Sequence, residues 1–104
     1  MLTRMEELLL LTVWRLQQDA YGLSIRRQVS DLLGKKVSVG AVYIPLERLA
    51  RKGLLESWES QPTARRGGRR KRFYKLSPTG MAALNTVKQI HNAAWSGLPD
   101  LAFG

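Results

Sequence analysis

The 104-residue sequence contains no cysteine and only one histidine, His91. Without cysteine the chain can form neither a disulfide framework nor a thiolate metal site, as is usual in a reducing compartment. It also lacks a cysteine nucleophile, and the sequence offers no evident carboxylate to orient His91 for catalysis. Its eight acidic residues include no spaced pair suited to acid–base work. We therefore expect no enzyme activity, no bound metal and no cofactor.

Long apolar runs are also missing. The one strong run, residues 8–13, is too short to span a bilayer and is followed closely by Arg15. Glu6 and Glu7 precede this run and no small-residue cleavage site follows it, so it does not resemble a signal peptide. These features predict a cytoplasmic protein that has no membrane partner.

Positive charge is abundant and concentrated. The net charge is +9, and six of the 17 basic residues lie within residues 65–72, around Gly67 and Gly68. Like charges repel, so a solvated loop without a partner does not usually gather six of them. The run therefore favours contact with a polyanion, and the DNA backbone is the preferred candidate. Anionic lipid and nonspecific RNA remain as alternatives.

Apolar spacing predicts four helices. Thr3 and Glu6 have the spacing of a capping box, which begins the first helix and takes it to about Asp19. Gly34 suits the end of a second helix, and Ser38 suits the start of a third. Ser77 and Pro78 then begin the last helix. The second, third and last helices are expected at about 22–33, 39–52 and 78–96.

A β-hairpin is predicted between the third and last helices. Its strands are expected at 54–60 and 72–76, and the basic run fills most of the tip between them. Trp58 is interpreted as a packing residue of the first strand. Pro45 lies within the third helix, where it removes one backbone hydrogen bond, so we expect a bend or a shortened regular part.

The first and last helices carry more apolar surface than a monomer needs. The first helix has a second stripe, with Leu10 and Trp14 nearly opposite the main one, and the last helix is apolar along one side. Asn85, Lys88, Gln89 and Asn92 are expected to face away from that side. A two-fold dimer would bury both surfaces. The predicted interface comprises Leu10, Trp14, Leu84, Val87, Ile90, His91, Ala94, Trp95 and Leu98.

The order of these elements predicts a winged helix-turn-helix, a mainly α fold with a small β-hairpin and a C-terminal dimerisation helix. Residues 1–76 would form the DNA-binding domain, 77–98 the dimerisation helix packed on it, and 99–104 a flexible tail. In this architecture a helix with a small N-terminus enters the major groove while a basic hairpin reaches the backbone or minor groove.

The predicted contacts with double-stranded DNA follow from this architecture. Tyr43 either packs under the β-hairpin, which is the wing of this architecture, or offers its hydroxyl to a phosphate. Arg48 either contacts DNA or pairs with Glu47 or Glu56. Lys35 and Lys36 either solvate the turn or contact phosphates. The predicted DNA-binding residues are Lys36, Ser38, Val39, Gly40, Ala41, Tyr43, Arg48, Arg65, Arg66, Arg69, Arg70 and Lys71.

An ordered set of short motifs, spread over roughly residues 5–95, resembles the PadR family of bacterial transcriptional regulators. The family commonly has Pro directly after the Tyr of the recognition helix, whereas here Ile44 intervenes and Pro45 follows. This departure leaves the exact helix geometry and the operator preference open. The matching residues are Tyr21-Gly22, 38–43, 46–49, 53–55, 67–74, 76–80 and Leu84.

The resemblance implies a homodimeric repressor whose last helix serves dimerisation, and this chain matches the short members in length. Some short members bind flat aromatic or cationic compounds between the subunits, with a last-helix Trp stacking on the ligand. Trp95 is the matching residue here, and Met5 and Trp14 are candidates to line the same space. Ordinary interface packing of Trp95 without any ligand is the alternative.

We therefore expect a dimeric, sequence-specific DNA-binding regulator that acts as a repressor. Relief by a planar aromatic ligand and constitutive repression without a ligand both remain open. A nucleoid or RNA-associated basic protein without sequence specificity is the first rival. An adaptor whose basic loop binds an acidic protein is the second.

Overall fold

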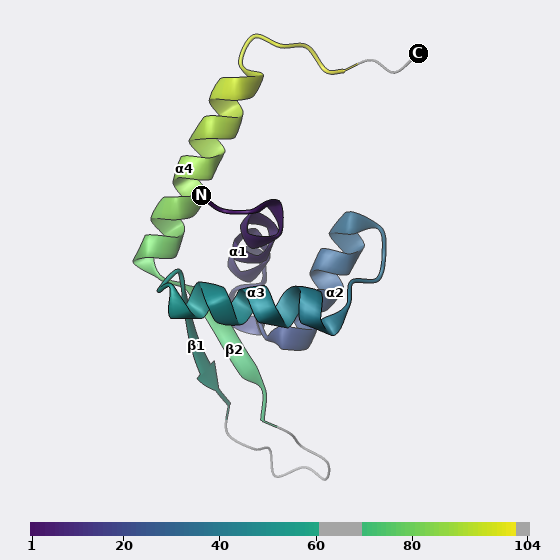
Figure 1. Ribbon diagram of the computed structural model, residues 1–104, viewed down its shortest axis with the longest axis vertical. Coiled ribbons are helices and arrows are strands. Elements are labelled where there is room, and N and C mark those ends of the chain that lie inside the picture. Colours follow the sequence, from purple (N-terminus) through teal and green to yellow (C-terminus); the bar gives the residue numbers. More distant parts are fainter. Residues whose placement is uncertain (61–69, 102–104) are drawn as a thin grey trace.

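The computed structural model describes residues 1–60 and 70–101, and these contain mostly helix with one antiparallel hairpin, as predicted (Figure 1). The second and third helices and the hairpin follow in the order of a winged helix-turn-helix. The elements are α1 (Arg4–Leu16), the 3-10 turn η1 (Gln17–Asp19), α2 (Gly22–Leu33), α3 (Val39–Arg51), β1 (Leu55–Glu59), β2 (Arg72–Leu76) and α4 (Pro78–Trp95).

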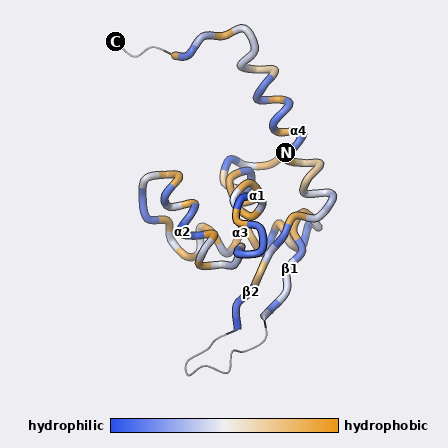
Figure 2. Tube along the Cα trace, turned by 180° about the vertical axis from the view of Figure 1, so that it is seen from behind, coloured by the Kyte–Doolittle hydropathy of each residue, from blue (hydrophilic) through white to orange (hydrophobic). Residues whose placement is uncertain are grey.

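One hydrophobic core lies where α1 meets α2, α3 and β2. Apolar residues of these elements form the core, and the colouring of Figure 2 shows hydrophobic and hydrophilic residues following one another along the helices. Each helix contributes residues at three- and four-residue spacing, which is why short amphipathic helices suffice for this small domain. The fully buried apolar side chains include Leu9, Leu10, Val13, Ile25, Val29, Val42, Leu46 and Leu49.

Leu10 corrects the predicted dimer interface. Its side chain is 0% exposed within a single chain, because α1 is covered by neighbours on more than one side. The second apolar stripe of α1 is therefore divided: Leu10 belongs to the monomer core, while Trp14 and Leu11 are about half exposed. Only the exposed part of this stripe is accessible to a partner.

The predicted capping box begins α1. The Thr3 hydroxyl accepts a hydrogen bond from the Glu6 N–H, and the Glu6 carboxylate accepts one from the Thr3 N–H at 2.8 Å. That backbone hydrogen bond, with Lys52 Nζ 3.6 Å away, lowers the pKa of the buried Glu6 carboxyl despite its desolvation. The helix ends at Leu16, earlier than expected, because Gln17 adopts a positive φ of 53° and η1 follows.

Pro45 does not interrupt α3. The helix runs without a break from Val39 to Arg51 and is capped by Ser38, whose hydroxyl accepts a hydrogen bond from the Ala41 N–H at 3.2 Å. Burial of Leu46 and Leu49 on the core side fixes the turns that follow Pro45. Tertiary packing has thus offset the local cost of the missing N–H.

The hairpin is tied to the body of the domain. β1 and β2 pair in antiparallel register, with Ser57 opposite Tyr74. The Tyr74 N–H donates to the Ala20 carbonyl at 2.9 Å, and Tyr21 forms an isolated bridge with Phe73. Trp58 stacks on Phe73 with ring centroids 6.0 Å apart, which agrees with its interpretation as a packing residue. The root of the wing is therefore held against the start of α2.

The start of α4 is fixed by a close backbone contact. The Ser77 hydroxyl accepts from the Gly80 N–H at 3.0 Å and donates to the Gly53 carbonyl at 2.5 Å, while the Ser77 N–H donates to the Leu54 carbonyl. A Cβ at Gly80 would overlap the carbonyl oxygen of Leu54. The first turn of α4 therefore lies directly on the chain that follows α3.

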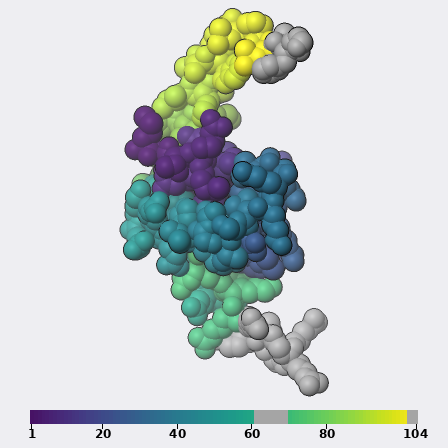
Figure 3. Space-filling model, turned by 45° about the vertical axis from the view of Figure 1, so that its right-hand side comes forward, coloured from purple at the N-terminus to yellow at the C-terminus, as the bar shows by residue number. Residues whose placement is uncertain are grey.

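Beyond its first turns α4 leaves the body of the molecule. Leu84 packs against the core, but every residue from Lys88 to the end of the helix is exposed (Figure 3). The radius of gyration is 15.9 Å and the extents are 55 × 33 × 21 Å, whereas a compact chain of this length has a radius of about 13 Å. The projecting α4 and the hairpin both make the molecule elongated (Figure 1).

Candidate nucleic-acid interface

The outward face of α3 is the centre of the candidate interface. Helical spacing places Gly40, Ile44 and Glu47 along the middle of this face, with Tyr43 at one edge and Arg48 at the other. All five are exposed. Ile44 was not among the predicted contacts, although its spacing of four from Gly40 would have placed it on this face.

The N-terminal turn of α3 is open, as its small residues predict. Val39 and Gly40 are exposed, and Ala41 is half-buried. The Ser38 hydroxyl is already engaged in capping Ala41, so this side chain serves the helix first. Gly40 has only the Ile44 Cδ1 atom near its missing side chain, at 3.7 Å, so the backbone there is bare to an approaching surface.

The Tyr43 side chain is neither buried in the core nor free in solvent. Its ring lies against the backbone of Gly22, where an added Cβ would come within 2.9 Å of the Tyr43 hydroxyl oxygen, and 37% of the residue remains exposed. Packing on α2 orients the ring while leaving its edge toward the surface. The Tyr43 ring therefore packs on Gly22, the second residue of the Tyr21-Gly22 motif. The sequence motif alone does not reveal this contact.

A groove of about 570 Å³ separates α3 from the wing. Burial, together with the nearby Glu47 carboxylate, raises the pKa of the Tyr74 hydroxyl. The groove is lined by both aromatic and cationic side chains. Its lining residues are Tyr21, Gly22, Leu23, Tyr43, Glu47, Arg70, Lys71, Arg72 and Tyr74.

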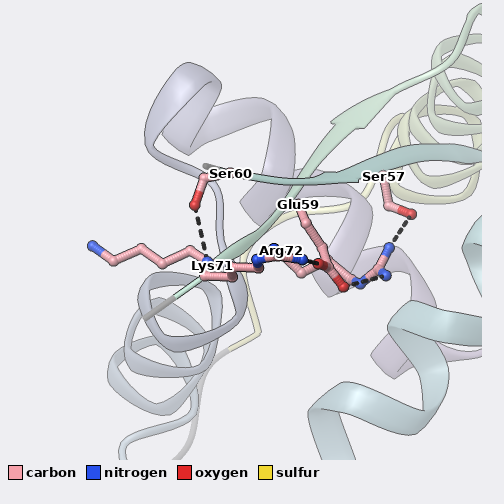
Figure 4. A network of polar contacts seen from close by, with 6 residues as sticks. Ser57, Glu59, Ser60, Lys71 and Arg72 are labelled. Atoms are coloured by element: carbon pink, nitrogen blue, oxygen red, sulfur yellow. Dashed lines mark hydrogen bonds and ion pairs between the residues drawn. The ribbon is translucent and has the colours of Figure 1, made fainter. Parts of the chain in front are cut away.

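Polar contacts join the end of β1 to the start of β2, at the part of the hairpin farthest from α4 (Figure 4). The Lys71 backbone N–H donates to the Ser60 hydroxyl at 2.9 Å, and the Ser60 N–H donates to the Lys71 carbonyl at 2.7 Å. The Arg72 guanidinium donates to the Ser57 hydroxyl and to the Glu59 carboxylate, at 3.1 and 3.3 Å. Arg72 is therefore a structural residue of the wing, which its place in the basic run does not indicate.

Two predicted cationic contacts of the wing can be placed. Arg70 is exposed and lies 3.6 Å from the Glu59 carboxylate, an exposed pair that costs little to exchange for a phosphate. The Lys71 ammonium lies over the Tyr21 ring, 4.4 Å from its centroid, which holds it at the groove. Arg65, Arg66 and Arg69 lie outside the described residues.

Arg48 and Lys36 remain accessible. Within the described part of the chain no ion pair joins Arg48 to Glu47 or Glu56, and Glu56 instead pairs with Lys75 at 3.7 Å. Lys36 is exposed in the turn between α2 and α3. Arg48 therefore lies on the outward face of α3 and Arg70 and Lys71 line the groove beside it, while Lys36 precedes α3 in the chain.

A second surface lies at the junction of α1 and α4. A groove of about 490 Å³ there is lined mainly by apolar side chains, including Trp14, Leu84 and Val87. Polar residues also enter it, since Asn85, Lys88 and Asn92 line the groove although they were expected to face away from the apolar side of α4. The packing of α4 against α1 brings that edge of the helix to the groove.

His91 has a carboxylate partner that the sequence did not reveal. Its Nε2 atom lies 3.5 Å from a Glu7 carboxylate oxygen across the α1–α4 groove. Expecting no orienting carboxylate was therefore wrong, because residues so far apart in the sequence meet only through the packing of these two helices. The pair sits on an open surface, and no cluster of three metal-ligating side chains is found among the described residues.

The remaining predicted interface and ligand residues fall into two groups. Ile90, His91, Ala94, Trp95 and Leu98 are exposed on the projecting part of α4 and just beyond it. Met5 is half-buried against the core, and neither Met5 nor Trp95 lines the α1–α4 groove. A space shared by Met5, Trp14 and Trp95 is thus not formed within one chain.

In the described ranges, 1–60 and 70–101, no helix combines the length and apolar character needed to cross a bilayer. Strands β1 and β2 lie on the opposite side of the domain from the projecting part of α4 (Figure 1), and β2 begins directly after the exposed residues Arg70 and Lys71. The two candidate surfaces are therefore physically separate.

Comparisons with known proteins agree with this architecture. RosR of Halobacterium salinarum superposes with a TM-score of 0.75 at 25% identity, over 95% of this chain and 82% of that one. A PadR family transcription regulator of Clostridium difficile gives 0.74 at 25% identity, over 88% and 91%. A PadR-like regulator of Bacillus cereus gives 0.67 at 21% identity, over 86% and 82%, and supports the fold. A sequence comparison with curated proteins gave no match.

The family match covers most of the chain. The model of the transcriptional regulator PadR-like family matches residues 10–86, a range that runs from the core of α1 through the wing and into α4. It includes the exposed face of α3 and the groove beside it. The chain therefore belongs to the PadR-like family of transcriptional regulators and is a DNA-binding regulator, not an enzyme.

Proposed function

We propose that two copies of the chain form a sequence-specific repressor in the cytoplasm, joined through α4 and the adjoining surface of α1. The observation that carries the proposal is the projecting part of α4, which exposes Ile90 and Trp95, with Leu98 exposed just beyond it. Exposed apolar surface of this extent on a small domain favours a partner surface. A two-fold dimer would bury it twice and place two α3 helices on one side of the assembly.

Each subunit would read one half-site of DNA. The open face of α3 enters the major groove and supplies register and base contacts, while Arg70, Lys71 and the basic residues at the wing tip contact the backbone or minor groove. Two-fold symmetry in the protein then calls for a palindromic operator with half-sites about one helical turn apart, or a multiple of it. Occupancy of such an operator excludes other proteins from the same DNA, which is the simplest route to repression.

The wing makes the first testable contribution. Replacing Arg69 and Arg70 with Ala should weaken binding to specific and nonspecific DNA alike, because phosphate contacts carry no sequence information. The slope of log affinity against log salt should flatten by about 1 for each phosphate that the variant no longer neutralises. Mobility-shift titrations at several salt concentrations, with a preferred and a scrambled duplex, measure both quantities.

The matched control is Arg4→Ala, which removes one exposed positive charge at the start of α1, away from the wing. This variant should keep the salt slope of the unaltered protein. An altered sequence preference with an unchanged salt slope in the Arg69, Arg70 variant would show that the wing reads bases rather than phosphates. Equal affinity of the unaltered protein for both duplexes would favour the rival function, a nonspecific nucleic-acid-binding protein.

The proposed repressor would also be released from DNA by a planar aromatic ligand. Trp95 is 51% exposed at the end of α4, where a symmetry-related Trp95 would offer a second indole face. Stacking and cation–π attraction contribute roughly 0.5–2 kcal/mol per contact. Such a ligand would release DNA only by binding one spacing of the two α3 helices better than another.

Titration with planar cationic dyes, followed by tryptophan fluorescence, tests this role. We expect quenching in the unaltered protein and its absence in Trp95→Ala. Trp58→Phe is the matched control, because Trp58 stacks on Phe73 in the wing and should not respond to a ligand at α4. Equal dye affinity in the unaltered protein and Trp95→Ala would remove Trp95 from the site, and no binding to either would indicate a repressor without this ligand.

A further inference from the structure

The most exposed apolar side chain of α3 is Ile44, with 59% of its surface accessible. Single exposed apolar residues are common on proteins and need no explanation by themselves. The position of this one is informative, because it lies at the middle of the outward face, between Gly40 and Glu47 and beside Tyr43 and Arg48. It is the only large aliphatic side chain among these five residues.

The local structure presents Ile44 as a rigid projection. A β-branched side chain in a helix has essentially one favoured χ1 rotamer, so little conformational freedom remains to be lost on binding. Its Cδ1 atom points back toward Gly40, 3.7 Å from the position of a Cβ there, and no other side chain covers Gly40. A bare backbone at Gly40 next to an apolar projection lets an opposing surface approach closely at this one point.

The major groove offers one apolar group at its base edges, the C5-methyl group of thymine. The other groups there are hydrogen-bond donors and acceptors, which Ile44 cannot satisfy and would desolvate at a cost. Tyr43 and Arg48 at the edges of the face suit phosphates or polar base edges. The chemistry of Ile44 therefore selects a methylated pyrimidine.

We propose that Ile44 is a specificity-determining residue that packs on the C5-methyl group of a thymine in each half-site of the operator. The inference rests on the proposed function, in which the outward face of α3 enters the major groove. It predicts a preference for thymine at one position of each half-site that follows from a methyl contact and not from hydrogen bonding.

The test removes the methyl group from the DNA and its partner from the protein. A preferred duplex is first selected from a random pool with the unaltered full-length protein, and each thymine is then replaced in turn by deoxyuridine, which keeps every hydrogen-bonding group. At one thymine per half-site we expect binding to weaken about fourfold, the effect of burying one methyl group. Ile44→Ala should weaken binding to the thymine duplex and be indifferent to deoxyuridine at that position.

Arg48→Ala is the control on the same helix, and it should lower affinity while keeping the full deoxyuridine effect. Thermal unfolding of Ile44→Ala should match that of the unaltered protein, because the side chain is exposed and Ala favours helix. A second probe places 5-methylcytosine where a half-site tolerates cytosine, and we expect it to restore affinity through the same methyl contact.

The possible results distinguish failure of the Ile44 contact from failure of the proposed sequence-specific repressor. If a duplex is selected but no thymine responds to deoxyuridine, or if Ile44→Ala keeps the full response, the role of Ile44 is wrong while sequence-specific binding stands. If selection enriches no sequence, both the inference and the proposed specific repressor are overturned.

Discussion

Replacing Gly80 with Ala is expected to lower the free energy of unfolding by about 3 kcal/mol, the upper part of the usual range for overpacking. The added Cβ would overlap the Leu54 carbonyl oxygen, which is backbone and cannot move aside like a flexible side chain. Separating the two segments would also strain the hydrogen bonds that Ser77 makes with Gly53 and Leu54. Chemical denaturation followed by circular dichroism measures the change.

Gly40→Ala is the matched control for this prediction. The same methyl group added to α3 finds only Ile44 Cδ1 at 3.7 Å, an ordinary contact. Glycine inside a helix costs roughly 0.5–1 kcal/mol relative to alanine, so this variant should be as stable as the unaltered protein or more stable. It should nonetheless bind DNA less well, because the methyl group stands on the face proposed to enter the major groove. Equal stability of the Gly80 and Gly40 variants would contradict the close contact at Gly80.

The Gly80 contact has a consequence for DNA binding as well. It sets the direction in which α4 leaves the body, and in the proposed dimer that direction sets the spacing of the two α3 helices. Some of the Gly80→Ala protein is expected to fold. Even after correction for the unfolded fraction, its affinity for an operator with two half-sites should be lower than that of the unaltered protein. Binding to a single half-site should follow the folded fraction.

The double replacement of Ala94 and Trp95 by Glu should produce monomers and abolish tight operator binding. Both residues are exposed on the projecting part of α4, so the fold of each chain should persist. In the proposed dimer, two carboxylates per subunit would enter an apolar interface at a large desolvation cost. We expect the dissociation constant of the dimer to rise by about 100-fold or more, and operator affinity to fall because the second half-site is no longer linked to the first.

Gln89→Glu combined with Ala93→Glu is the control, since it adds the same two charges. These residues are exposed on the side of α4 that bears neither the apolar stripe nor the groove lining. Light scattering at micromolar concentration should give a dimer for the control and a monomer for the Ala94, Trp95 variant. A clean monomer for the unaltered chain would refute the proposed dimer.

Local sequence signals predicted the elements well. The capping residues Thr3, Ser38 and Ser77 each begin a helix, because the side-chain hydroxyl that satisfies a free N–H lies within three residues of it. Strand β2 has the predicted bounds, and β1 is shorter by one residue at each end. The first helix ends earlier than predicted because Gln17 has a positive φ, which the spacing of apolar residues does not indicate.

The errors share a different origin. Apolar spacing shows that α1 has two apolar stripes, but it does not show which stripe meets the rest of the chain, so Leu10 was assigned to a partner although it is fully buried. Pro45 was expected to bend α3 or to shorten its regular part, and the shortening did not occur, because the helix is unbroken from Val39 to Arg51. The Glu7–His91 contact depends on how two helices distant in sequence pack, and no local pattern encodes it.

The amino-acid sequence by itself determined the order of elements, the concentration of positive charge in the wing and the family, because these depend on neighbouring residues and composition. Only the tertiary structure decided which apolar surfaces remain open and that Gly80 must lack a side chain. It also showed that the Tyr43 ring packs on the backbone of Gly22. These properties depend on which segments meet in space, and burial and close contact are set by packing between residues far apart in the chain.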